Sequence, residues 1–310
     1  MEIQTGEGLK EVLLLLRQGN PFEAQKIISI LFENDLDNKE LIYTNKCCIF
    51  WLDSMARLNE IEDSYERSDS ILLEWKNFNE YISREKNRYE PTFFAVQEGF
   101  FKNALEEFKK LTEEKDSFQR AEIYRKIGIC CKKLGDFENA RTYLTEANNI
   151  YPNIASVLAE LADCYSLCGE DKIGKLLFRE AFFADPDNID LDFLDSELIL
   201  CLITKTKEKG FSGRALRYWI PVYGVLSGVF NIKRELTSQE VARLKKDIYA
   251  MESEFKDPAC NSEILIPHLL YCYFWLMDHY SLANENRAKI NEVLLKIKIL
   301  DSNVYEAYIR

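Results

Sequence analysis

Two consecutive stretches of the chain align with each other without a gap: AEIYRKIGICCKKLGDFENARTYLTEANNIYPNI, residues 121–154, and ASVLAELADCYSLCGEDKIGKLLFREAFFADPDN, residues 155–188. The alignment places Gly135 on Gly169 and Pro152 on Pro186. On both sides of each glycine, apolar residues recur three or four positions apart, which is the spacing of one helix face. Each stretch therefore predicts two helices joined by a turn at the glycine and ended by the proline, which cannot continue a helix.

Each stretch resembles a tetratricopeptide repeat, a helix–turn–helix unit of about 34 residues with large residues inside its first helix and small residues where two helices cross. The matching residues are Tyr124, Ile127, Gly128, Ala140, Leu144 and Ala147 in the first stretch, and Leu158, Leu161, Ala162, Gly174, Phe178 and Ala181 in the second. The resemblance implies an all-α fold, an α-solenoid of antiparallel helix pairs that winds as a right-handed superhelix.

The second stretch also contains a match to the opening of a phosphate-binding loop, G-x-x-x-x-G-K, at Gly169, Gly174 and Lys175. Such a loop needs a preceding β-strand and a Ser or Thr after the lysine to hold magnesium. Here a helix is predicted before it, Leu176 follows it, and the acidic Glu170 lies inside it. We therefore interpret Gly169 as a turn residue and Gly174 as a small residue at a helix crossing, and we expect no nucleotide cofactor.

The remaining chain is predicted to be helical, with the repeat pattern fading toward both ends. GNPFEA (19–24) and GFFKNA (99–104) match GDFENA (135–140) in spacing, which predicts further helix pairs over 5–38 and 85–120. Pro91 falls within the first helix of the 85–120 copy, so that copy is expected to be kinked or to start late. We expect three regions: N-terminal helical pairs (1–84), repeats (85–190) and a divergent helical part (191–310). Helices of this length predict roughly twelve to fourteen in all.

The composition of the chain indicates which classes of partner and which cellular compartment to expect. A formal net charge of -12 argues against general nucleic-acid binding. The start of the chain lacks the basic and apolar regions of a signal peptide. The longest apolar stretches, 218–232 and 264–277, fall short of the ~20 residues that span a bilayer. We therefore expect a cytoplasmic protein without stable membrane insertion.

The nine cysteines are expected to be reduced, because their odd count comes without a secretion signal. A zinc site would need a second pair of ligands at matching spacing, so no metal is expected. His268 and Cys272, four residues apart on one predicted helix face, are the first candidates if a metal does bind.

Residues 205–234, KTKEKGFSGRALRYWIPVYGVLSGVFNIKR, fit no repeat. They hold seven Lys or Arg, one Glu and five aromatic residues, and their glycines with Pro221 predict that no continuous helix forms. One interpretation is an irregular connecting segment whose apolar half fills the core of the solenoid. Another is a partner-binding surface, because Arg and aromatic residues dominate interface energetics. Its candidate residues are Arg214, Arg217, Tyr218 and Trp219. A membrane-surface patch or a single-stranded nucleic-acid platform would use the same residue types.

A helix is predicted after this segment, with Thr237 and Glu240 at capping-box spacing. Its apolar residues recur at intervals of three and four, as in a short coiled-coil seam. The seam residues are Val241, Leu244, Ile248, Met251 and Phe255. We expect this stripe to pack within its own domain, with homodimer contact as the alternative.

The resemblance implies a protein–protein interaction scaffold rather than an enzyme. In tetratricopeptide repeat proteins the first helices of the pairs line a concave groove that binds peptides. The corresponding groove positions are Tyr89, Phe93, Arg125, Ile129, Lys132, Lys133, Asp163 and Ser166. Ile129 and Asp163 occupy places where carboxylate-clamping members of the family carry asparagine, so binding of a peptide C-terminus is not supported. A regulatory or assembly subunit acting through homo-oligomerisation is the alternative. No nucleophile elbow, metal motif or phosphate loop favours an enzyme.

Overall fold

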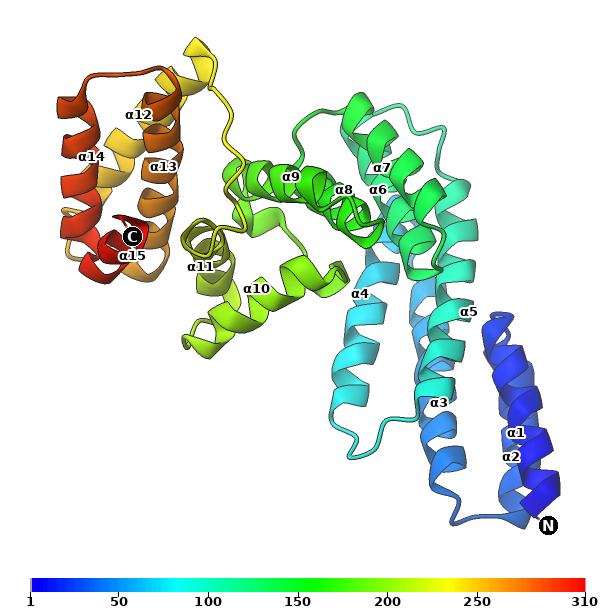
Figure 1. Ribbon diagram of the computed structural model, residues 1–310. Coiled ribbons are helices and arrows are strands. Elements are labelled where there is room, and N and C mark those ends of the chain that lie inside the picture. The colour runs from blue at the N-terminus through cyan, green and yellow to red at the C-terminus, as the bar shows by residue number, and fades with distance from the viewer. Residues whose placement is uncertain (1, 310) are drawn as a thin grey trace. The chain divides into compact units, whose positions relative to one another are not determined.

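A computed structural model describes the backbone of residues 2–309 and the side chains of residues 6–309 (Figure 1). Every regular element in residues 2–309 is helical, and no strand occurs there. The chain divides into two compact units, with the boundary between Pro152 and Asn153. This boundary falls two residues before the end of the first aligned stretch, within the predicted repeat region 85–190.

The N-terminal unit contains α1 (Glu2–Arg17), α2 (Pro21–Asn34), α3 (Lys39–Asn59), α4 (Ser64–Ser83), α5 (Glu90–Lys109), α6 (Ser117–Lys133) and α7 (Phe137–Ile150). The C-terminal unit contains α8 (Ala155–Leu167), α9 (Asp171–Ala184), α10 (Glu197–Glu208), α11 (Gly213–Leu226), α12 (Ser238–Glu254), α13 (Ser262–Leu282), α14 (Arg287–Leu300) and α15 (Ser302–Ile309). The short 3₁₀ turns η1 (Pro186–Asn188) and η2 (Leu191–Phe193) lie between α9 and α10. These fifteen α-helices exceed the expected number, partly because residues 302–309 form a helix and not a plain tail.

Three helix pairs share one glycine turn. Gly19, Gly135 and Gly169 have positive φ angles of 74°, 80° and 80°, and follow α1, α6 and α8. In each turn the next residue donates its N–H to the carbonyl five positions back, at 2.9–3.0 Å. This is a Schellman motif, which requires a left-handed residue that glycine adopts without steric cost. The predicted turns at Gly135 and Gly169 are confirmed, and so is the turn at Gly19 in the 5–38 copy.

The predicted pair in 85–120 is wrong. Residues 90–109 form the single helix α5, and GFFKNA lies in its middle. Pro91 stands in the first turn, where its missing N–H has no helical acceptor to lose. Gly99 serves close packing: a Cβ on it would lie 1.8 Å from the carbonyl oxygen of Leu16 and 2.8 Å from the backbone nitrogen of Gly19.

Small residues do mark close helix crossings in the two aligned stretches. A Cβ on Gly128 would lie 2.5 Å from the Leu144 side chain of α7. A Cβ on Gly174 would lie 2.0 Å from Ser166 Oγ of α8. Ala140, which takes the place of Gly174 in the first stretch, is fully buried. The helices within each pair therefore approach so closely that larger residues would not fit.

The C-terminal unit is built around α13, which packs against α11, α12 and α14. Nearly every residue from Leu269 to Asp278 is buried, so this helix is apolar on all sides. Leu244, Ile248 and Met251 of the predicted α12 stripe are buried in this core and Val241 packs against it, so that part of the stripe packs within its own unit; Phe255, at the end of the stripe, is exposed. The capping box of Thr237 and Glu240 is also confirmed. No helix in the described part of the chain is both long and apolar enough to span a membrane.

Two alanine substitutions should have opposite effects on stability. Gly99→Ala should lower the free energy of unfolding by about 1–3 kcal/mol, because the new methyl group collides with backbone that cannot move freely. Gly6→Ala should raise it by about 0.5–1 kcal/mol, because Gly6 lies in α1 with open space around it and alanine favours the helix. Urea unfolding followed by circular dichroism measures both. Equal stability of the two variants would contradict the close contact at Gly99.

Candidate functional site

A network of hydrogen bonds and ion pairs in the C-terminal unit surrounds the segment that joins α11 to α12. This segment is non-helical from residue 231 to 237, and three of its consecutive residues are held by partners on α9, α12 and α13. The carbonyl oxygen of Ile232 accepts a hydrogen bond from Arg179 Nη1 at 2.5 Å. Lys233 Nζ lies 2.7 Å from Asp278 Oδ1, and Arg234 pairs with Glu180 and Glu240.

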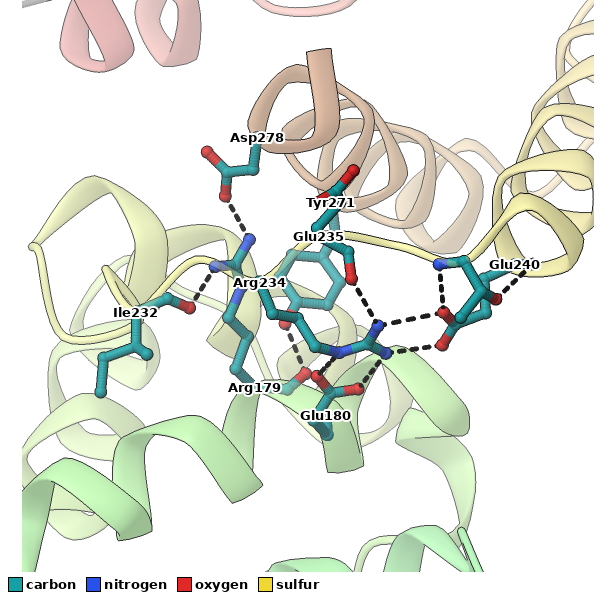
Figure 2. A network of polar contacts seen from close by, with 9 residues as sticks. Arg179, Glu180, Ile232, Arg234, Glu235, Glu240, Tyr271 and Asp278 are labelled. Carbon is teal, nitrogen blue, oxygen red and sulfur yellow. Dashed lines mark hydrogen bonds and ion pairs between the residues drawn. The ribbon is translucent and has the colours of Figure 1, made fainter. Parts of the chain in front are cut away.

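Arg179 is the buried centre of this network (Figure 2). Its side chain is fully enclosed, and its Nη2 forms an ion pair with Asp278 of α13. The guanidinium lies 4.3 Å from the ring centroid of Trp275, which adds a cation–π contact. The carbonyl oxygen of Arg179 accepts a hydrogen bond from the hydroxyl of Tyr271 at 2.8 Å. Arg179 therefore fixes the position of α9 against α13.

Arg234 joins α9 to the start of α12. Figure 2 shows its guanidinium between the carboxylates of Glu180 and Glu240. Glu240 also accepts a hydrogen bond from the backbone N–H of Thr237 at 2.8 Å, as the capping box requires. The hydrogen bond from Arg234, with the backbone hydrogen bond, lowers the pKa of Glu240 to about 2, although partial burial opposes the shift. Both carboxylates therefore face a fixed positive charge.

A cleft of about 640 Å³ opens beside this network, between α9, α12 and α13. Its lining is mixed: the apolar Phe183, Leu244 and Met251, with the buried Leu158 and Cys272, lie among five charged residues. The remaining lining comes from Asn153, Glu180, Ala184, Arg234, Glu240, Arg243, Asp247, Ala250 and His268. A concave surface of this size can hold a ligand, because its volume lies within the range of roughly 300–1,000 Å³ that binding pockets usually have.

His268 and Cys272 both line this cleft. Burial lowers the pKa of His268 from its ordinary value and raises the pKa of Cys272 to about 12, so the thiol stays protonated at neutral pH. A cysteine binds a metal ion as the thiolate, and the burial of Cys272 disfavours that charged form. Among the residues whose side chains are described, no group of three or more His, Cys, Asp or Glu has metal-binding geometry.

The predicted groove residues are mostly buried or engaged in the fold. In the N-terminal unit, Phe93, Ile129 and Lys132 are buried, so their side chains are not available to a partner in this structure. Tyr89 is half-buried against the ring of Tyr43, at 5.4 Å between centroids. The remaining two are half-buried as well: Arg125 pairs with Glu122 at 2.8 Å, and Lys133 accepts a hydrogen bond at its carbonyl oxygen from Gln97.

The two groove residues of the C-terminal unit have structural roles. Asp163 is fully buried, and its carboxylate accepts hydrogen bonds from the backbone N–H groups of Asp195 and Ser196 at 2.8–3.1 Å. These are donors at the start of α10, so Asp163 caps that helix from a distance. Ser166 packs against Gly174 at the α8–α9 crossing. The assignment of Asp163 as a groove residue is therefore wrong.

Residues 205–234, which we call the basic-aromatic segment, also differ from the prediction. It contains the end of α10 and all of α11, which continues through the buried Pro221. Trp219 is buried and stacks on Phe211, at 4.6 Å between centroids, and on Tyr223. Since these rings belong to the core of their own unit, Trp219 cannot anchor a partner. The interpretation that the apolar half of the segment fills the core is confirmed.

The charged side chains of this segment pair with acids of the same unit. Arg214 binds both carboxylate oxygens of Asp187, at 2.6–3.1 Å, and remains more than half exposed. The buried Tyr218 donates its hydroxyl hydrogen to the same carboxylate at 2.9 Å. Arg217 is half-buried, and its Nε has no hydrogen-bond partner. Tyr218, like Trp219, is therefore not an exposed anchor.

Sequence reasoning missed Arg179, Arg234 and Asp278. The available signal was one or two charged residues inside an apolar run, as in LLFREAFF (176–183) and FWLMDHY (274–280). A charge on an otherwise buried helix face indicates a buried partner. Lys126 in the N-terminal unit is a second case: it is buried, its Nζ lies 2.5 Å from Asp69 Oδ1, and burial lowers its pKa.

Removing the carboxylate of Asp278 should be strongly destabilising. Asp278→Ala leaves the buried guanidinium of Arg179 without its counter-charge, and we expect a loss of about 3–5 kcal/mol in the free energy of unfolding. The control is Glu80→Ala, which removes an exposed pair with Arg84 one helical turn away. That variant should lose less than about 0.5 kcal/mol. Chemical denaturation compares the two, and similar losses would contradict the role of Asp278.

Glu240 should contribute a pH-dependent part of the stability. Its pKa is about 2 in the folded protein and 4.5 ordinarily, so its contribution is present above about pH 4.5 and is lost as the pH falls toward 2. The difference in melting temperature between wild type and Glu240→Gln should therefore shrink over this range. Glu235→Gln, a neighbouring exposed change, is the control. A difference that stays constant with pH would contradict the ion pair.

No protein-family model matches the sequence. A search of the curated proteins finds no match either.

Proposed function

We propose that this chain is a non-catalytic scaffold that binds a segment of a partner protein in the cleft between α9, α12 and α13. The observation that carries the proposal is the cleft itself, whose lining combines apolar and charged side chains. The resemblance of residues 121–188 to tetratricopeptide repeats supports the same function, because repeats of this family bind peptides.

The chemistry of the cleft suggests what the partner segment carries. Phe183, Leu244 and Met251 in the lining would contact apolar side chains of the segment. At the rim, Arg243 is highly exposed and its ion pair with Asp247 is long, at 3.9 Å. Its guanidinium can therefore turn toward a carboxylate of a ligand at little cost. We infer a short amphipathic segment with an acidic residue near its apolar anchors.

The acids of the cleft support binding more than proton transfer. Glu180 and Glu240 are both paired with Arg234. A general acid or base near neutral pH needs a pKa close to the working pH, and the pKa of Glu240 is about 2. Glu240 therefore remains ionised and works as an electrostatic support for the linker and for the start of α12.

The test uses peptides selected for binding to the intact protein from a random display library. Binding of a selected, labelled peptide is followed by fluorescence anisotropy for the wild type and for Arg243→Glu combined with Ala250→Lys, two exposed positions that line the cleft. We expect the Kd to rise at least about tenfold, or about 1.4 kcal/mol. Both positions are exposed, so the fold should be retained, which circular dichroism checks.

Lys246→Glu is the matched control. It makes a charge reversal of the same sign on the same helix, and Lys246 is exposed outside the cleft. Its Kd should stay within about twofold of wild type. If the double variant binds as tightly as wild type, the peptide site lies elsewhere, and Arg214→Glu then tests residues 205–234 as the alternative surface.

A further inference from the structure

A pocket of about 230 Å³ opens in the N-terminal unit between α3, α4 and α5. Its walls include four buried side chains, Trp51, Ile71, Phe100 and Ala104. The volume equals that of about eight water molecules at ~30 Å³ each. It also lies below the roughly 300 Å³ at which sites for drug-sized ligands begin. An occupant of this pocket would therefore be a small molecule and not a peptide segment.

The aromatic wall of the pocket is held in place by rings behind it. Trp51 and Phe100 lie 6.1 Å apart between ring centroids. Phe100 also contacts Trp75 at 5.2 Å and Phe101 at 5.5 Å, and neither of these two rings lines the pocket. Because its neighbours fix it, Phe100 has little freedom to turn into the open space. The pocket is therefore preformed, and an apolar group that enters it releases water from the aromatic wall.

Three charged residues line the pocket, and only one of them forms an ion pair among the described side chains. Glu107 pairs with Lys110 of the same helix at 2.5 Å. Arg67 donates from Nε and Nη2 to the carbonyl oxygen of Ile61 at 2.9 and 2.5 Å, so its guanidinium is oriented, but no carboxylate in this part of the chain pairs with it. Glu106 is exposed and likewise has no cationic partner there. The pocket therefore offers one unpaired positive group and one unpaired negative group beside an aromatic wall.

We propose that this pocket binds a free α-amino acid with an apolar side chain. The carboxylate of the ligand pairs with Arg67 of α4, and its ammonium group pairs with Glu106 of α5. Its side chain lies against Trp51 and Phe100. In an α-amino acid these three groups diverge from one carbon atom, and a pocket this small brings partners from three helices to one ligand.

A zwitterion suits the pocket better than a ligand with a single charge. A simple cation would leave Arg67 facing a like charge, and a simple anion would do the same to Glu106. The aromatic wall adds a preference for an apolar side chain, because only such a side chain releases water from it without losing hydrogen bonds. The pocket shares no residue with the cleft between α9, α12 and α13, so the proposal stands or fails independently of peptide binding.

Binding is measured by isothermal titration calorimetry of the full chain, with L-phenylalanine as the probe. Three comparison ligands each lack one group: 2-phenylethylamine lacks the carboxylate, 3-phenylpropionate lacks the ammonium group, and glycine lacks the side chain. We expect L-phenylalanine to bind with a Kd below about 1 mM. Each comparison ligand should bind at least about threefold more weakly, because each loses one of the three contacts. An amine or an acid that binds as tightly as L-phenylalanine overturns the recognition of a zwitterion.

The variant Glu106→Gln assigns the binding to this pocket. Glu106 is exposed, so the variant should fold, which circular dichroism checks. It should weaken the binding of L-phenylalanine and of 2-phenylethylamine at least about threefold, and it should not weaken 3-phenylpropionate, which has no ammonium group. Glu33→Gln, a change at an exposed glutamate of α2 outside the pocket, is the matched control and should bind all ligands as wild type does.

Two further results would overturn the proposal. One is the absence of binding by L-phenylalanine, L-leucine and L-methionine at concentrations up to about 10 mM. The other is a Kd for L-phenylalanine that is the same in Glu106→Gln as in wild type, because the ligand would then bind elsewhere on the protein.

Discussion

A guanidinium can leave water only where its charge and its hydrogen-bonding groups find partners, and this constraint shapes the C-terminal unit. Arg179 meets most of this requirement with the carboxylate of Asp278, the carbonyl oxygen of Ile232 and the face of Trp275, while its Nε has no hydrogen-bond partner among the described residues. These partners come from α13 and from the segment before α12. All of them must therefore be in place together.

A buried ion pair of this kind adds little net stability compared with a well-packed apolar pair, but it discriminates strongly between arrangements. Sliding α9 along α13 by one turn would leave Arg179 and Asp278 buried without each other. The adjacent Arg234, between Glu180 and Glu240, makes a similar demand on the start of α12. Together the two arginines link α9 to α13 and to the start of α12, the three helices that border the cleft.

The sequence by itself determined the local features. The glycine turns after α1, α6 and α8 could be predicted, because a Schellman motif involves only about six consecutive residues and demands a left-handed conformation at one of them. The capping box at Thr237 and the inward stripe of α12 follow from equally local spacing. The same spacing gave the close crossings at Gly128 and Gly174.

Only the tertiary structure decided which role a residue plays when contacts distant in the sequence compete for it. GFFKNA has the spacing of a turn, but Gly99 lies inside a helix because the backbone at Leu16 approaches it. Asp163 has the position of a groove residue, but the uncapped start of α10 takes its carboxylate. Trp219 has the composition of a binding anchor, but Phe211 and Tyr223 enclose it. In each case the residue's role is set by a packing or hydrogen-bonding contact with a residue distant in the sequence. A local sequence pattern does not contain that contact.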